Sequence, residues 1–440
     1  MLRNIKQKIF KSPFEANLHF NVEWRWMPTL YVSKGLAYVV LFLTSLILFK
    51  RLGVNNSELT FFISCCFLPL WLRPILSLFV HISHYHRGWI LGTQLLFTLS
   101  IAGIAYALAN NEWTDTMPLL YGLLSVSTVF YDISTDKYIL NAINSKQLST
   151  LSIRKLSYYL IAMLIGLGII VMMAGNLEVL TRMIKSSWST AFYMLSMLLG
   201  ILWIWNLFIL PRTINRKREY NVRVADMFYA SLNTLADLIR MPRSWSGILF
   251  ILFYILPFVL LAPISMLFTI DLGSSGGLCL SPQEFGFTQG TVGVFALALG
   301  VIIGFCLLLK HSLFTMLPWM TIALCLPNII YVYLSFTLPN NITWISCCIF
   351  VQQLTCGFGL FAYLRYIVYY SEVKRFATYP LCLSLTTLSV MCGMMISGSL
   401  QQAMGYRQYF ILTTFCCIAP VVVSLIVLGV ERKSSAFNTK

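Results

Sequence analysis

The sequence predicts an all-α integral membrane protein with twelve transmembrane helices in two six-helix halves. Three observations predict this fold class. Hydrophobic residues make up 58% of the 440 residues, charged residues make up only 10%, and the mean hydropathy is +0.78. The apolar residues come in runs that reach the roughly 20 residues a helix needs to cross the hydrocarbon of a bilayer. The period-two alternation of membrane-spanning strands is absent, which excludes that class.

Twelve spans follow when the apolar runs are divided at their polar, glycine or proline breaks. Pro257 and Pro263 are expected to bend the seventh span, because each removes a backbone donor. Gly286 and Gly290 in the eighth span favour close helix packing or a gating role. In chain order the spans cover approximately 28–49, 58–80, 88–109, 117–140, 154–175, 189–210, 245–269, 284–308, 313–336, 342–369, 376–400 and 407–430.

The basic residues indicate the orientation, because cytoplasmic loops carry an excess of Lys and Arg. With the N terminus inside, the loops on the other side hold only Lys50, Arg51, Arg182, Lys185 and Arg407 of the 31 basic residues. We therefore expect both termini to be cytoplasmic. The net charge of +16 reflects this topology and attraction to anionic lipid, so nucleic acid is not an expected partner.

The basic segment between the sixth and seventh spans divides the chain into two blocks. Apolar residues recur in it every three or four positions, which predicts an amphipathic helix that either tethers the halves or lies on the membrane surface. The expected parts are an N-terminal cytoplasmic segment at 1–27, a first half at 28–210, the linker at 211–244, a second half at 245–430 and a cytoplasmic tail at 431–440.

Charged residues inside the spans are the main candidates for function. Lys34 lies ~10 Å below the cytoplasmic surface, and Asp132 and Asp136 lie ~12 and ~6 Å deep on one face of the fourth span. An unpaired lysine at such depth costs about 2–3 kcal/mol, so Asp132 is the expected partner of Lys34. Two alternatives stay open: Lys34 extends to the interface, or Asp136 pairs with Lys137 or Arg154.

Other polar residues extend the predicted cavity. Gln352 and Gln353 offer uncharged amides that suit a sugar or peptide ligand, or that join helices to one another. Arg365 lies at a depth similar to that of Lys34 and either joins the same layer or extends to the interface. The candidate substrate or coupling residues are Lys34, Tyr38, Asp132, Asp136, Gln352, Gln353 and Arg365.

Several segments resemble the AmpG-type muropeptide permeases and their acetyl-CoA-transporter relatives, a branch of the major facilitator superfamily. The resemblance implies that the first, fourth, seventh and tenth spans line a central cavity between the halves. The segments that carry it are "WMPTLYVSKGLAYVV" at 26–40, "YDISTDKYIL" at 131–140, "GGLCLSPQEFGFTQGTVGVFALALG" at 276–300, "LPNIIYVYLS" at 326–335 and "CGFGLFAYL" at 356–364.

The chain departs from that family at charged positions. Lys34 stands where the family usually has a glutamate, His81 and Gln352 stand where it has acids, and Arg365 replaces an apolar residue. Proton coupling, which the family implies, is therefore in doubt for this chain. Asp132 is the one deep carboxylate left to carry a proton, and a neighbouring Lys34 would keep it ionised.

The resemblance implies a secondary transporter of the bacterial inner (plasma) membrane that works by alternating access and imports a muropeptide-like or other anionic cell-wall-derived solute. The alternatives are a facilitator of a different anionic amphiphile, such as an acyl-CoA-like or phosphorylated solute, and a non-transporting receptor or scaffold. No nucleophile elbow or phosphate-binding loop indicates an enzyme, and no cofactor is expected. His81, His84 and His86 form a single cluster, which favours a solvated turn over a metal site.

Overall fold

A computed structural model describes residues 26–82, 86–110, 113–142, 148–211, 244–374 and 379–437. Eleven helices in these ranges are long and apolar enough to cross a membrane, and the number rises to twelve when the bent second span is included. The predicted fold class is confirmed. The linker with its predicted amphipathic helix lies almost entirely outside the described residues, so that prediction stays a prediction.

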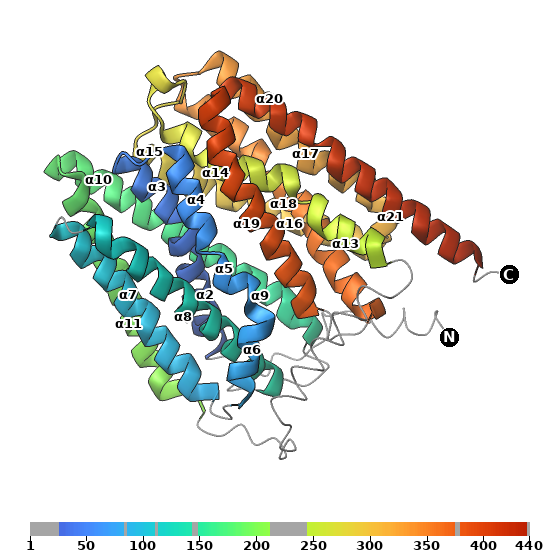
Figure 1. The fold of residues 1–440 in the computed structure, drawn as a ribbon, viewed down its shortest axis with the longest axis horizontal. Helices are drawn as coiled ribbons and strands as arrows, with labels where there is room; N and C mark the ends of the chain where they lie inside the picture. Colours follow the sequence, from blue (N-terminus) through green and yellow to red (C-terminus); the bar gives the residue numbers. More distant parts are fainter. Residues whose placement is uncertain are drawn as a thin grey trace.

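The N-terminal half holds the first six spans (Figure 1). The second span bends by 48° between Asn56–Trp71 and Arg73–Val80, where Pro74 interrupts the backbone hydrogen bonding. Two spans contain short π-helical segments, η3 and η4. The elements are α2 (Met27–Val39), η3 (Val40–Thr44), α3 (Ser45–Arg51), α4 (Asn56–Cys65), α5 (Leu68–Trp71), α6 (Arg73–Ile82), α7 (His86–Ala109), α8 (Trp113–Ala142), α9 (Leu148–Met163), η4 (Leu164–Ile170), α10 (Val171–Thr181) and α11 (Ile184–Ile209).

The C-terminal half holds the remaining spans. Its seventh span breaks as predicted, because Pro257 lies in the first turn of α14, whereas Pro263 lies inside α14 without ending it. The elements are α13 (Ser244–Phe253), α14 (Leu256–Ile270), η5 (Gly273–Ser275), α15 (Pro282–Phe285), η6 (Gly286–Gly293), α16 (Val294–Lys310), α17 (Leu313–Thr337), α18 (Ile342–Lys374), α19 (Tyr379–Met404), α20 (Tyr406–Cys416) and α21 (Ile418–Phe437).

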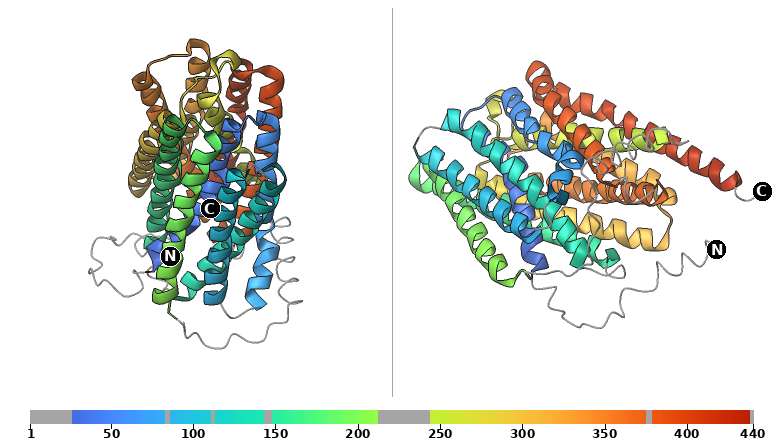
Figure 2. Two further views of the ribbon diagram at one scale, coloured as in Figure 1. Left: turned by 90° about the vertical axis from the view of Figure 1, so that its left-hand side faces the viewer. Right: turned by 60° about the horizontal axis from the view of Figure 1, so that its bottom comes forward.

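The two ends of the helix bundle differ in how the halves meet. At one end, which we call the Lys50 end, α3 and α4 lie against α14 and α19, and α10 lies against α15. At the other end, which we call the Arg87 end, α6 lies against α19 of the C-terminal half (Figures 1 and 2). The largest buried apolar cluster includes residues from both halves, such as Leu48 and Leu267. The halves are therefore in contact at both ends, through different helices.

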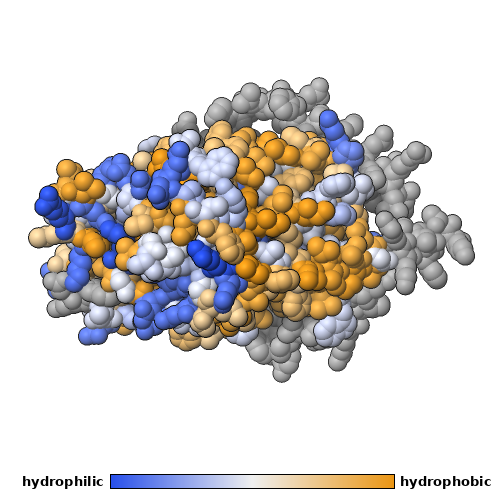
Figure 3. Space-filling model, turned by 90° about the horizontal axis from the view of Figure 1, so that it is seen from above, coloured by the Kyte–Doolittle hydropathy of each residue, from blue (hydrophilic) through white to orange (hydrophobic). Residues whose placement is uncertain are grey.

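The outer surface of the bundle is apolar. Large hydrophobic side chains point outward along the spans, among them Leu180 and Phe208, each 79% exposed. Broad hydrophobic areas are visible on the face shown in Figure 3. Such a surface is unstable in water and matches the hydrocarbon of a bilayer. The chain is thus an integral membrane protein.

Candidate functional site: a buried charged cluster

The site begins with an ion pair between two spans of the N-terminal half. Lys34 on α2 and Asp132 on α8 form an ion pair through the lysine Nζ and the carboxylate Oδ1. Both side chains are almost fully buried, at 2% and 3% exposure. A buried charge in the membrane needs such a partner. The predicted pairing of Lys34 with Asp132 is confirmed, and extension of Lys34 to the interface is excluded.

Two further cations complete the cluster. Arg73 on α6 places Nη1 2.6 Å from Asp132 Oδ2 and Nη2 2.7 Å from Asp136 Oδ2. Lys155 on α9 places Nζ 3.2 Å from Asp136 Oδ1, and Lys34 Nζ lies at the same distance from that oxygen. Three cations therefore share two carboxylates. With every group in its ordinary charge state, the cluster carries one excess positive charge.

Sequence reasoning missed Arg73 and Lys155, because both were assigned to cytoplasmic segments. The signal was available: Arg73 falls inside the predicted span 58–80, and Lys155 falls inside the predicted span 154–175. Asp136 pairs with Lys34, Arg73 and Lys155. Lys137, one of the two partners expected for it, donates to the Ser77 carbonyl at 2.9 Å, and the side chain of the other, Arg154, lies outside the described residues.

The cluster has a sealed side and an accessible side. Lys34 and Asp132 are closed off, whereas the side chains of Arg73, Asp136 and Lys155 are 20%, 24% and 32% exposed. A small anion could therefore reach Lys155 and Arg73 without disturbing the Lys34–Asp132 pair.

Tyrosines surround the cations. Lys34 Nζ lies 5.8 Å from the centre of the Tyr31 ring and 6.0 Å from that of Tyr159, and Lys155 Nζ lies 5.5 Å from the Tyr31 ring. Such contacts stabilise a desolvated ammonium. Tyr38, a predicted site residue, is half-buried one helical turn from Lys34, and its ring stacks on Phe42. Tyr31 is buried and stacks on Tyr158, whereas the half-buried ring of Tyr159 could contact a sugar or another planar group.

The predicted glutamines lie in the C-terminal half. Gln353 on α18 donates to Gln289 on η6 at 3.1 Å, and Gln289 donates to the Tyr331 hydroxyl at 3.1 Å. This ladder supports the helix-joining role for Gln353. Gln352 is 4% exposed, and its amide oxygen accepts no hydrogen bond from the described residues. Gln289 was not singled out from the sequence, where it is one polar residue among glycines and threonines.

Arg365 does not join the cluster. It lies exposed on α18 and forms no ion pair with the described residues. The expectation that it shares a layer with Lys34 and Asp132 is wrong for a geometric reason. Phe361, one turn before Arg365, packs against Gly304 of α16. This face of α18 therefore points toward α16 of the C-terminal half and not toward the charged cluster.

Gly286 and Gly290 lie where the two halves cross. A side-chain carbon at Gly290 would collide with the backbone of Gly168 in η4, and one at Gly286 would collide with Met172. These glycines therefore allow η6 to pack closely against η4 and the start of α10, and both lie within η6.

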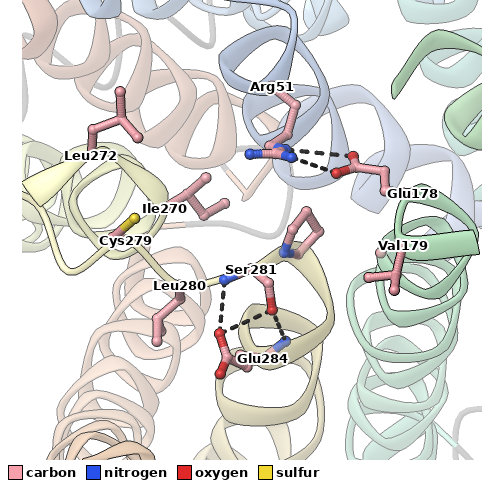
Figure 4. A pocket seen from close by; sticks show the side chains of 11 residues that line it. Arg51, Glu178, Val179, Ile270, Leu272, Cys279, Leu280, Ser281 and Glu284 are labelled. Atoms are coloured by element: carbon pink, nitrogen blue, oxygen red, sulfur yellow. Dashed lines mark hydrogen bonds and ion pairs between the residues drawn. The ribbon is translucent and has the colours of Figure 1, made fainter. Parts of the chain in front are cut away.

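A separate pocket lies between the halves at the Lys50 end (Figure 4). Its volume is about 370 Å³. Arg51 and Glu178, both of the N-terminal half, form an ion pair at 2.5 Å on one wall of the pocket. On the opposite wall Ser281 and Glu284 form a reciprocal cap of α15. Pocket and charged cluster are thus at different levels of the bundle.

Two six-helix halves around polar groups within the membrane define an all-α integral membrane protein with the major facilitator fold. The chain is 22% identical over 395 residues to "Putative transporter AmpG 4" of Rickettsia felis, a match that covers 87% of this chain and 91% of that protein. The predicted resemblance to AmpG-type permeases is confirmed. No family model matches the chain.

Solved structures share the fold. The nucleoside transporter NupG superposes with a TM-score of 0.67 at 12% identity, covering 93% of this chain and 98% of that one. A bacterial homologue of the human lysosomal transporter Spinster, in an inward-facing unoccupied conformation, gives 0.67 at 12% identity, covering 92% and 95%. A POT family transporter in complex with a thioalcohol-conjugated peptide gives 0.67 at 10% identity, covering 93% and 96%.

Proposed function

We propose that the protein is a secondary membrane transporter that moves an anionic solute by alternating access between residues 28–210 and 245–430. The charged cluster of Lys34, Arg73, Asp132, Asp136 and Lys155 is the observation that carries this proposal. A chain that needed only structural ion pairs would balance its buried charges, whereas this cluster keeps an excess cation on its accessible side. The similar proteins that are named as transporters support transport over catalysis.

The solute we favour is a muropeptide-like cell-wall fragment. Its peptide carboxylates match the accessible Lys155 and Arg73, and its sugar rings match the half-buried ring of Tyr159. The neutral amides of Gln352 and Gln353 offer a second set of hydrogen-bonding groups in the other half. The second candidate is a phosphorylated or acyl-CoA-like solute, which the same cationic surplus favours.

We further propose that the Arg87 end faces the cytoplasm and that net transport is import. The basic residues support this orientation, because few of the described Lys and Arg lie at the Lys50 end, namely Lys50, Arg51, Arg182, Lys185 and Arg407. The charged cluster lies toward the Arg87 end, which is the side from which an imported solute would be released.

Both buried carboxylates are already occupied by cations. Asp132 contacts Lys34 and Arg73, and Asp136 contacts Lys34, Arg73 and Lys155. A proton carrier has to bind and release a proton in each cycle, which such pairing opposes. We therefore propose facilitated diffusion or weak proton coupling. Uptake of a radiolabelled muropeptide into proteoliposomes, with and without an inward proton gradient, tests this. Strict dependence on the gradient would disprove the uncoupled version.

Lys155→Gln tests the role of the excess charge. The variant removes the most accessible cation of the cluster and is expected to raise the KM for an anionic solute about tenfold, which corresponds to roughly 1.4 kcal/mol of binding. Lys310→Gln, an exposed lysine in the last turn of α16, is the matched control and should leave KM unchanged. A non-transporting scaffold would show no specific uptake in either variant or in the unmodified protein.

A further inference from the structure

One polar network joins the two halves at the Lys50 end. Lys50 of α3 lies 2.8 Å from the carboxylate of Asp271, the residue after α14. Asp271 also accepts a hydrogen bond from the Tyr406 hydroxyl of α20 at 2.8 Å. Asn56 of α4 accepts from Lys50 at 2.8 Å and donates to Gln401 of α19 at 2.7 Å. Lys50 and Asn56 belong to the first half, and the other three belong to the second.

The network is buried and complete. Asn56, Gln401 and Tyr406 are 7%, 6% and 3% exposed, and each of them has a partner in the opposite half. Buried polar groups that satisfy one another in this way are costly to separate. The closed arrangement therefore has a specific set of bonds that an open arrangement would lose.

The pair of Lys50 and Asp271 differs from every other ion pair of the described residues. The pairs of the charged cluster lie within the N-terminal half, and so does the Arg51–Glu178 pair. Lys50–Asp271 alone crosses from one half to the other. Next to Asn56, Gly398 of α19 packs so closely against Thr60 and the Asn56 backbone that a side chain at position 398 would collide with them.

We propose that Lys50, Asn56, Asp271, Gln401 and Tyr406 form a latch that holds the Lys50 end shut, and that the pocket beside it is the vestibule through which solute enters when the latch separates. The proposal rests on the proposed function, because alternating access requires an end that opens. The pocket is lined by both halves, with Arg51 and Glu178 on one side and Cys279 and Ser281 on the other (Figure 4). Separation of the halves would widen it.

The test measures opening without any solute. Thr60 is fully buried beside Gly398, so a thiol placed there by Thr60→Cys reacts with a water-soluble maleimide only when the Lys50 end opens. Purified protein in nanodiscs is labelled and the modification at position 60 is followed by peptide mass spectrometry. In this background Asp271→Asn is expected to raise the labelling rate about tenfold, which corresponds to roughly 1.4 kcal/mol.

Glu178→Gln is the matched control. It neutralises an acid of the same pocket whose partner, Arg51, belongs to the same half, so the labelling rate should stay unchanged. Tyr406→Phe removes one hydrogen bond to Asp271 with little change of shape and should raise the rate by less than Asp271→Asn. An unchanged rate in Asp271→Asn, or an equal rise in Glu178→Gln, would overturn the latch. If Asp271→Asn raises the labelling rate but the unmodified protein shows no uptake, the proposed latch would stand and the proposed transport function would be disproved.

Discussion

Asp132 holds two cations at once, and this determines what each substitution in the cluster does. Lys34 contacts one carboxylate oxygen and Arg73 the other. Counting residues along two spans was enough to predict the Lys34–Asp132 pair, because both depths follow from the helical rise. Arg73 also falls inside a predicted span, but residue counting could not place it beside Asp132. Its position depends on the 48° bend of the second span, and the size and direction of a proline bend depend on tertiary packing.

Asp132→Asn is expected to lower the free energy of unfolding by about 3–5 kcal/mol, the usual cost of removing one partner from a buried ion pair, because Lys34, Arg73 and Lys155 then share Asp136 alone. Lys34→Met should cost less, because Asp132 keeps its contact with Arg73. Thermal unfolding of both variants in the same detergent compares the two losses. A smaller loss for Asp132→Asn than for Lys34→Met would contradict the role of Asp132 as the shared anchor.

At the scale of elements, the crossing of η4 and η6 sets how closely the two halves approach. Gly168 and Gly290 meet there without side chains between the backbones. The sequence identified Gly290 as a packing or gating position, but it did not identify Gly168 as the partner. Which side of each helix the two glycines face depends on the π-helical segments η4 and η6. A π-helical segment changes the direction in which the following residues face, compared with the 3.6-residue periodicity of a regular α-helix.

Gly290→Ala should prevent this approach. The added carbon would collide with the backbone of Gly168, which cannot move aside as the end of a flexible side chain can. We expect a lower melting temperature and weaker closure of the Lys50 end. Gly122→Ala on α8 is the control, because a side chain there meets no atom within 4 Å and alanine favours the helix. Equal melting temperatures for the two variants would show that the crossing tolerates a wider gap.

For the molecule as a whole, apolar run length predicted the spans and the division into halves, because a bilayer requires long helices with satisfied backbones. The arrangement of the halves was beyond the sequence. Contacts between them depend on short polar side chains such as Asn56 and Gln401, which hydropathy does not distinguish from other loop-proximal residues. The exposed position of Arg365 was missed for a similar reason, since depth does not determine which way a helix face points.

A crosslink between the halves is expected to stop transport reversibly. The hydroxyls of Ser57 and Ser399 lie 2.9 Å apart across α4 and α19. The double variant Ser57→Cys and Ser399→Cys should form a disulfide on oxidation, lose uptake, and regain it on reduction. Each single variant should transport in both conditions. Undiminished uptake by the oxidised double variant, with the disulfide verified by mass, would show that these helices need not separate.

All five residues of the charged cluster belong to one half, and this limits what the cluster can do energetically. When the halves rock, Lys34, Arg73, Asp132, Asp136 and Lys155 move together, so their geometry is the same in both orientations. A ligand with equal affinity for two states shifts no population between them. An anion that binds only to the cluster therefore does not change the populations of the two orientations. A transported solute must also contact the C-terminal half.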